Sequence, residues 1–169
     1  MLSLAFVARL FCGEPAPDFT LYTTDGQKIE LSDLRGRIIV IVFLDHRSSQ
    51  SILTARAMET RLWRANFQNR MIYLFGILVV ASQADAAGFK DAIGLTYPIL
   101  FDTNGDVWNR YKISDRTPLS VIIGRNGTLE YIKDGFNANE IIQKVNELQS
   151  SNIYFTTWWK IKELFRKNN

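Results

Sequence analysis

The chain has 169 residues, of which 47% are hydrophobic and 22% charged, so it is long enough for one domain with a substantial core. A single cysteine, Cys12, and a single histidine, His46, exclude an intramolecular disulfide and argue against a zinc site, so we expect neither metal nor cofactor. The net charge of +3 equals the charge of residues 152–169, which hold four basic residues and one acidic residue, and the body has no basic stripe typical of nucleic-acid binding.

The chain begins with an apolar segment, MLSLAFVARLF, in which Ser3 and Arg9 are the polar residues. This segment is too short to span a bilayer. A signal peptide has its basic residues before the apolar part, whereas Arg9 comes late. We therefore expect residues 1–12 to be a helix or an unstructured leader, and an atypical export signal is the alternative.

The clearest element is the run Ile38–Leu44, which is almost entirely β-branched and apolar and is bounded by Gly36 and Asp45. Such a run predicts a central strand buried on both faces, as in a parallel sheet with helices on each side. A helical pattern from Ser49 to Phe67 follows it at once. Catalytic and binding residues often lie where a strand leads into the N-terminus of a helix, because the free N–H groups there stabilise an anion.

The other elements are predicted from turn signals and periodicity. Asp25-Gly26 indicates a hairpin of Asp18–Thr23 and Gln27–Leu31, and Ser32 is expected to cap one helical turn that Gly36 ends. The remaining predictions are a strand at Met71–Val80, a helix at Ala84–Ile93 ended by Gly94, an extended piece at Pro98–Phe101, a helix at Gly105–Tyr111, a hairpin of Leu119–Ile123 and Leu129–Lys133, and an amphipathic helix at Ala138–Leu148.

Several short motifs occur in an order that resembles the redoxin family. They are Ala16-Pro17-Asp18-Phe19, Asp25-Gly26, Leu31-Ser32-Asp33-Leu34-Arg35-Gly36, Tyr97-Pro98-Ile99-Leu100-Phe101-Asp102, Asn104-Gly105 and Thr117-Pro118. That family joins thiol–disulfide reductases to peroxiredoxins of the AhpC/TSA type. The resemblance covers residues 13–149 and implies an α/β thioredoxin-like mixed sheet, flanked by helices on both faces, with an N-terminal hairpin. Residues 150–169 would add an extra basic, aromatic helix.

The resemblance also locates the family's active site, and the expected cysteines are missing from it. Where the reductases have Cys-x-x-Cys, this chain has Ser48-Ser49-Gln50-Ser51, and the peroxidatic pattern Pro-x-x-x-Thr-x-x-Cys is absent around residues 43–51. Thr117-Pro118 matches the family's cis-proline, which offers backbone groups to an extended substrate. The family's Glu and kinking Pro fall on Thr54 and Arg56, so we expect no kink.

The residues at this site favour binding over catalysis. A serine hydroxyl is too weak an acid for a helix dipole to ionise and needs an adjacent base. His46 lies two residues before Ser48, but no third orienting group is evident, which argues against a Ser–His hydrolase. Capping of the helix by Ser48 or Ser49 is the structural alternative and is worth roughly 1 kcal/mol. His46 and Arg47 either form a solvated loop or recognise an anionic or peptide ligand.

Three functional hypotheses follow from the resemblance. The first is a redox-inactive redoxin with a degenerate active site that retains a groove for a protein or peptide partner. The second is a thiol–disulfide oxidoreductase whose cysteines have been replaced by serine at Ser48 and Ser51. The third, a peroxidase using Cys12, is the weakest, because Cys12 lies ahead of the domain. The resemblance allows a cytoplasmic or a bacterial cell-envelope location.

The C-terminal segment, residues 152–169, lies outside the resemblance and is dense in aromatic residues. Trp158, Ile161, Leu164 and Phe165 follow a helical spacing, with basic residues around them. We expect this stripe to pack on the domain or on a second subunit. Contact with an anionic membrane surface or with a partner is the alternative.

Overall fold

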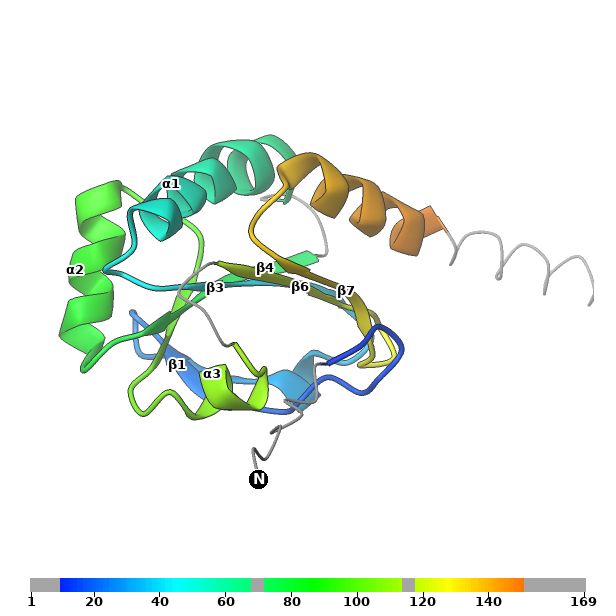
Figure 1. Ribbon diagram of the computed structural model, residues 1–169, viewed down its shortest axis with the longest axis horizontal. Coiled ribbons are helices and arrows are strands. Elements are labelled where there is room, and N and C mark those ends of the chain that lie inside the picture. Colours follow the sequence, from blue (N-terminus) through cyan, green and yellow to red (C-terminus); the bar gives the residue numbers. More distant parts are fainter. Residues whose placement is uncertain (1–9, 68–71, 114–117, 151–169) are drawn as a thin grey trace, which may run out of the picture.

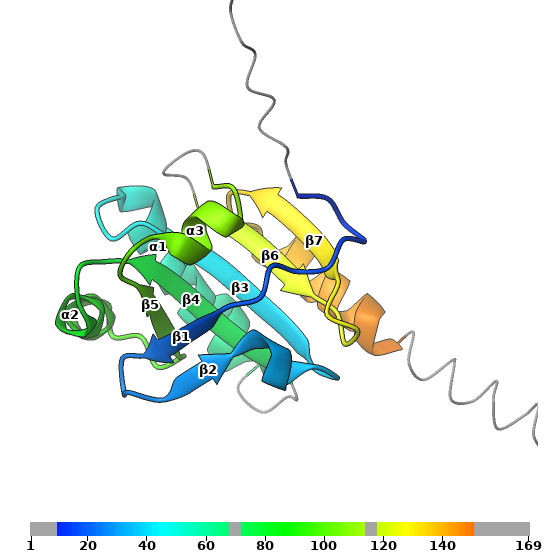
Figure 2. The same ribbon diagram turned by 90° about the horizontal axis from the view of Figure 1, so that it is seen from below.

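The computed structural model describes residues 10–67, 72–113 and 118–150, and these form one mixed β-sheet with helices on both faces (Figure 1). The strand order is β2-β1-β5-β4-β3-β6-β7, and the strands can be followed across the sheet in Figure 2. Their bounds are β1 Thr20–Thr23, β2 Lys28–Glu30, β3 Ile38–Leu44, β4 Ile72–Val79, β5 Ile99–Asp102, β6 Leu119–Ile123 and β7 Leu129–Asp134. Strands β3, β4 and β5 are parallel, and the other pairs are antiparallel.

Strand β3 is the centre of the sheet, as the apolar run predicts, and all seven of its residues are buried. It pairs with β4 on one side and with β6 on the other. Because successive side chains of a strand point to opposite faces, β3 contributes to two separate cores. Val40 and Val42 belong to the core that also contains Leu62. Ile41 and Phe43 join the core on the other face.

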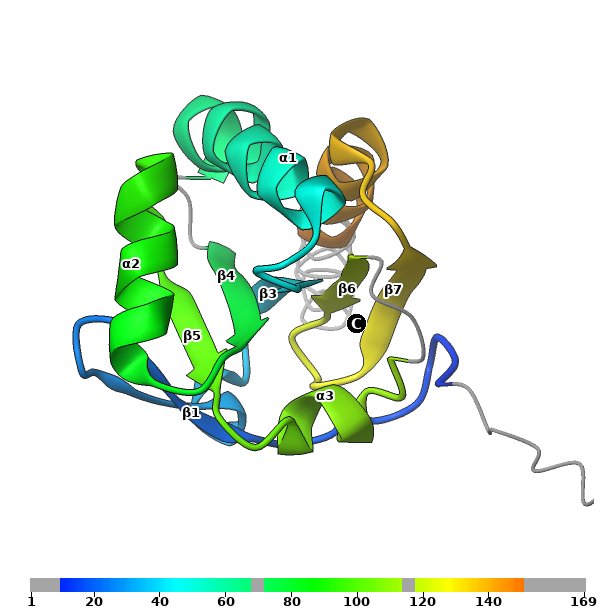
Figure 3. The ribbon, with the colours of Figure 1, turned by 60° about the vertical axis from the view of Figure 1, so that its left-hand side comes forward.

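The helices divide between the two faces of the sheet, which confirms the thioredoxin-like fold class. Helix α1 (Ser49–Ala57), its continuation η2 (Met58–Phe67), α2 (Gln83–Ile93) and the helix of residues 138–150 all contribute to one core. Figure 3 shows α1 and the last helix side by side on that face. The short helix α3 (Asp106–Arg110) and the 3₁₀ turn η1 (Leu31–Leu34) cover the other face.

The helix predicted from Ser49 to Phe67 has the expected extent, but its winding changes from α to π at Met58. A π-helix brings residue i+5 beside residue i. Accordingly, the Arg64 Nε donates to Glu59 Oε1 at 2.5 Å. The buried Glu59 carboxylate also accepts from the Thr96 N–H and hydroxyl, at 2.7 and 2.6 Å. Burial raises the pKa of Glu59, but the bonds from Thr96 and Arg64 outweigh it and hold that pKa below its usual value.

One local prediction was wrong, because Ser32 does not cap the first helical turn. The turn η1 begins at Leu31 after Glu30 and has no side-chain cap, and the Ser32 hydroxyl instead donates to Glu30 Oε1 at 3.3 Å. Gly36 ends the turn with a φ of 85°, a left-handed conformation that favours glycine.

Most of the leader predicted at residues 1–12 and of the tail predicted at residues 150–169 lies outside the described residues, namely residues 1–9 and 151–169. In the described part of the chain, no helix combines the length and apolarity needed to cross a membrane.

Candidate functional site

The candidate site begins at the N-terminus of α1, where the sequence places the family's first active-site position. Ser48 is the N-cap residue of α1, with extended backbone dihedrals. Its hydroxyl oxygen accepts from the Ser51 N–H at 3.4 Å, and its carbonyl accepts from the Ile52 N–H at 3.1 Å. Ser48 therefore caps α1, as the structural alternative for this residue predicted.

Ser51 stands at the second family position and is fully buried. Its hydroxyl oxygen accepts a hydrogen bond from the Asp45 N–H at 3.0 Å, which ties the end of β3 to the first turn of α1. Ser49 and Gln50, between the two positions, are exposed. Both serine oxygens at the family positions therefore accept bonds from the backbone of this loop.

Asp45 is a buried carboxylate that organises the loop between β3 and α1. Its Oδ1 accepts from the Arg47 N–H at 2.9 Å and from Arg47 Nε at 3.3 Å. Burial raises the pKa of Asp45, but the bonds and charge of Arg47 outweigh it, so that pKa lies below its usual value. The Arg47 side chain remains 60% exposed, so it is anchored at one end and open to solvent at the other.

His46 is directed toward β4 and not toward the serines. Its Nδ1 lies 3.2 Å from the Val79 carbonyl oxygen. A carbonyl oxygen can only accept, so a hydrogen bond at this contact requires Nδ1 to be the donor. Within the described residues, no hydrogen bond joins His46 to Ser48 or Ser51. The structure therefore does not assemble the nucleophile and base that a Ser–His hydrolase needs.

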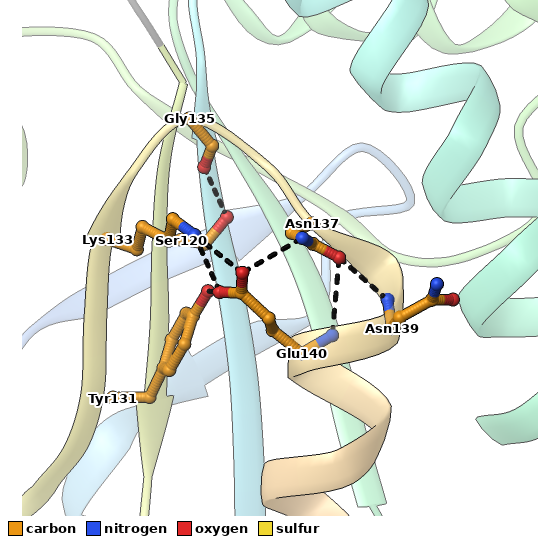
Figure 4. Close-up of polar contacts among 7 residues, drawn as sticks. All are labelled: Ser120, Tyr131, Lys133, Gly135, Asn137, Asn139 and Glu140. Atoms are coloured by element: carbon orange, nitrogen blue, oxygen red, sulfur yellow. Dashed lines mark hydrogen bonds and ion pairs between the residues drawn. The ribbon is translucent and has the colours of Figure 1, made fainter.

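The opposite side of the site is formed by the start of β6 and the end of β7. Phe43 pairs with Leu119, so the strand register carries Pro118 next to the end of β3. Pro118 is buried, and its carbonyl accepts from the Gly135 N–H at 2.5 Å. The Gly135 carbonyl in turn accepts from the Ser120 hydroxyl at 2.7 Å (Figure 4). Pro118 therefore lies at the same end of the sheet as the N-terminus of α1.

Thr117 lies outside the described residues, so the cis bond expected before Pro118 stays a prediction. The same holds for the substrate-binding role that the resemblance gives to Thr117.

A polar cluster fixes the junction between β7 and the last helix, as Figure 4 shows. Asn137 caps that helix, because its Oδ1 accepts from the N–H groups of Asn139 and Glu140. The Glu140 carboxylate accepts from the Tyr131 hydroxyl at 2.9 Å and from Lys133 Nζ at 2.7 Å. These bonds lower the pKa of Glu140, whereas burial and the same carboxylate raise that of Tyr131. Sequence reasoning missed this cluster, although the spacing of Asn137 and Glu140 resembles a capping box.

Cys12 is exposed and belongs to a different surface. It lines a groove on the α3 face of the sheet, whose other lining residues are Leu10, Phe11, Tyr111, Lys112, Leu119, Ile132 and Asp134. Neither Ser48 nor Ser51 lines that groove. Over the described ranges, no three His, Cys, Asp or Glu side chains are grouped closely enough to hold a metal ion.

The family model for the AhpC/TSA family matches residues 12–132 of the chain. A Mycobacterium tuberculosis (strain H37Rv) protein assigned as a peroxiredoxin is 34% identical over 106 residues, which cover 61% of this chain and 66% of that relative. The thiol-disulfide oxidoreductase ResA of Bacillus subtilis is 25% identical over 130 residues, covering 77% and 71%. Among solved structures, a Bacteroides thetaiotaomicron protein assigned as a disulfide isomerase superposes with a TM-score of 0.75 at 27% identity, covering 82% of this chain and 90% of that one.

Proposed function

Because the chain belongs to the AhpC/TSA family, we propose that it is a redoxin-fold protein without dithiol chemistry that binds a protein or peptide partner. We propose that the binding site is the surface formed by the N-terminus of α1 and by the start of β6 at Pro118, which lie at the same end of the sheet, and we call this surface the redoxin groove. Its residues are His46, Arg47, Ser48, Ser49 and Gln50 on one side, and Pro118 and Gly135 on the other.

The observation that carries this proposal is the state of the two family positions. A dithiol reductase must cycle between two thiols and a disulfide, and the one cysteine of the chain, Cys12, lies on another surface. Ser48 caps α1, and Ser51 is buried against the backbone of Asp45. Both hydroxyls therefore stabilise the loop, and within the described residues no hydrogen bond joins either hydroxyl to a histidine or carboxylate side chain that could make it a nucleophile.

The same loop supports a binding role because parts of it are rigid and parts are open. Asp45 and Ser51 hold its backbone from the buried side. Ser49 and Gln50 are exposed at the first turn of α1, and the Arg47 side chain is largely exposed next to them. Groups held in place before binding lose less conformational entropy when a partner arrives.

The oxidoreductase alternative rests on one specific observation, namely that the serines keep the family's geometry. Ser48 stands at the N-cap and Ser51 is buried one turn further on, which are the positions that the resemblance gives to the two cysteines. Under this alternative, Ser48→Cys with Ser51→Cys restores the thiol–disulfide oxidoreductase activity for which relatives such as ResA are named.

Peptide selection on immobilised protein tests the proposed groove. Peptides selected from a random display library should bind in solution, and Ser49→Trp should weaken their binding at least tenfold, because the indole would cover the exposed first turn of α1. Gln27→Trp, an equally bulky change in the exposed β1–β2 turn, is the matched control and should leave binding unchanged. Peptides that bind both variants as tightly as the wild type would show that the groove is not the binding site.

A further inference from the structure

The outer face of α1 and η2 continues directly from the redoxin groove and is unusually cationic. Residues 49–67 contain three arginines and one acidic residue, Glu59. Glu59 is buried and is already bound to Thr96 and Arg64. What remains on the solvent side of this element are Arg56 and Arg61, both exposed.

Arg56 and Arg61 differ from Arg64 in that neither pairs with Glu59. Within the described residues, neither guanidinium makes an ion pair or a side-chain hydrogen bond. Both arginines belong to the continuous helical element formed by α1 and η2, Arg56 in α1 and Arg61 in η2. Two exposed cationic side chains without an acidic partner attract an anionic group.

An exposed apolar side chain lies on the same element, between the arginines and the groove. Leu53 is 61% exposed, one turn after Ser49 and one turn before Arg56. A leucine flanked by unpaired arginines is the composition of an interface patch, in which apolar contact supplies affinity and charge supplies orientation. We define Leu53, Arg56 and Arg61 as the α1 patch.

We propose that the α1 patch selects an acidic partner, namely a protein segment that carries carboxylates for Arg56 and Arg61 and an apolar side chain for Leu53. This inference rests on the proposed function, because it assigns the chemistry of the partner that enters the redoxin groove. From Ser49 to Arg61 the helix extends over roughly 18 Å at 1.5 Å per residue, a length that one partner segment can cover in a standard interface. Carboxylates on the partner then complete the pairing that the chain itself leaves open.

The probe for this proposal is a fluorescein-labelled peptide, Gly-Glu-Glu-Leu-Glu-Glu-Leu-Glu-Glu-Gly, with a counterpart in which every Glu is replaced by Gln. Fluorescence anisotropy should show that the wild-type chain binds the Glu peptide at least tenfold more tightly than the Gln peptide at low salt. Arg56→Gln with Arg61→Gln should weaken Glu-peptide binding at least fivefold. The matched control, Lys28→Gln with Lys112→Gln, removes the same charge from exposed positions off this helix and should change it less than twofold.

Three outcomes of the peptide and vesicle assays overturn the inference. The first is equal binding of the Glu and Gln peptides, and the second is an equal loss in the two double variants, which would indicate unspecific attraction to the net charge. The third is binding of phosphatidylglycerol vesicles, lost in the arginine variant, without binding of the Glu peptide, which would assign the patch to a lipid surface.

Ser49→Trp separates this inference from the proposed function. If Ser49→Trp abolishes peptide binding and the arginine variant does not, the groove stands and the acidic preference is wrong. If only the arginine variant loses binding, the α1 patch stands alone and the groove is wrong.

Discussion

Replacing Ser51 by Ala tests the role that the structure gives to this residue. The substitution removes the acceptor of the Asp45 N–H at a position where Ser51 is 0% and Asp45 6% exposed. A buried donor that loses its acceptor costs about 1–3 kcal/mol. For a domain of this size, each kcal/mol lowers Tm by roughly 2–4 °C. Ser51→Cys should cost less, because sulfur remains a weak acceptor.

Urea unfolding followed by circular dichroism measures this effect, together with thermal melting. Ser49→Ala is the matched control, because Ser49 is exposed on the same turn of α1 and its replacement should change stability by less than about 0.5 kcal/mol. A Ser51→Ala variant as stable as Ser49→Ala would refute the reasoning, since Ser51 would then hold nothing in place.

Three further predictions concern the core, the helices and the tail. Glu59→Gln should destabilise the fold at pH 7. Because the pKa of Glu59 is lower in the folded state than in the unfolded state, the ionised carboxylate stabilises the fold above the unfolded pKa, and this stability is lost as pH falls. In urea unfolding, the difference in stability between the variant and the wild type should therefore be smaller at pH 3 than at pH 7. Gly76→Ala should cost about 1–3 kcal/mol in the same assay, because its Cβ would lie 2.7 Å from Ile99 Cδ1 in the core. Deleting residues 152–169 should lower Tm by several degrees if the tail packs on the body; sedimentation of the full chain with anionic vesicles, lost on deletion, would instead support membrane contact.

The central strand and the order of elements could be predicted because local signals were strong. The run Ile38–Leu44 is buried along its whole length, and Gly94 ends α2 in a left-handed conformation, as its position indicated. The π winding after Met58 could not be predicted, because the apolar spacing of this segment is equally typical of an α-helix, and the bond between Glu59 and Thr96 could not be predicted because the two residues are distant in the sequence. The cap assigned to Ser32 failed because the turn starts two residues earlier, at Leu31, with Glu30 in the N-cap position.

The candidate site could be located from the sequence, but its bonding could not. The resemblance placed Ser48 and Ser51 at the start of α1, and the capping role of Ser48 followed from its residue type. Sequence alone did not show that Ser51 is more deeply buried than Ser48, or that its hydroxyl accepts from the Asp45 N–H. Both features depend on the conformation of the loop between β3 and α1. His46 and Ser48 are two residues apart in the sequence, which made a contact between them possible. In the structure His46 contacts the Val79 carbonyl oxygen instead, and nothing in the sequence indicated that partner.

Reduction of insulin disulfides by dithiothreitol is the most direct test of the central claim, that the two serines leave this redoxin fold without dithiol chemistry. The chain as it stands, and its Cys12→Ala variant, should not accelerate the reaction above background. The double variant Ser48→Cys with Ser51→Cys, made in the Cys12→Ala background, tests the oxidoreductase alternative, which predicts that this variant accelerates the reaction. Acceleration by the Cys12→Ala chain with both serines in place would contradict the claim.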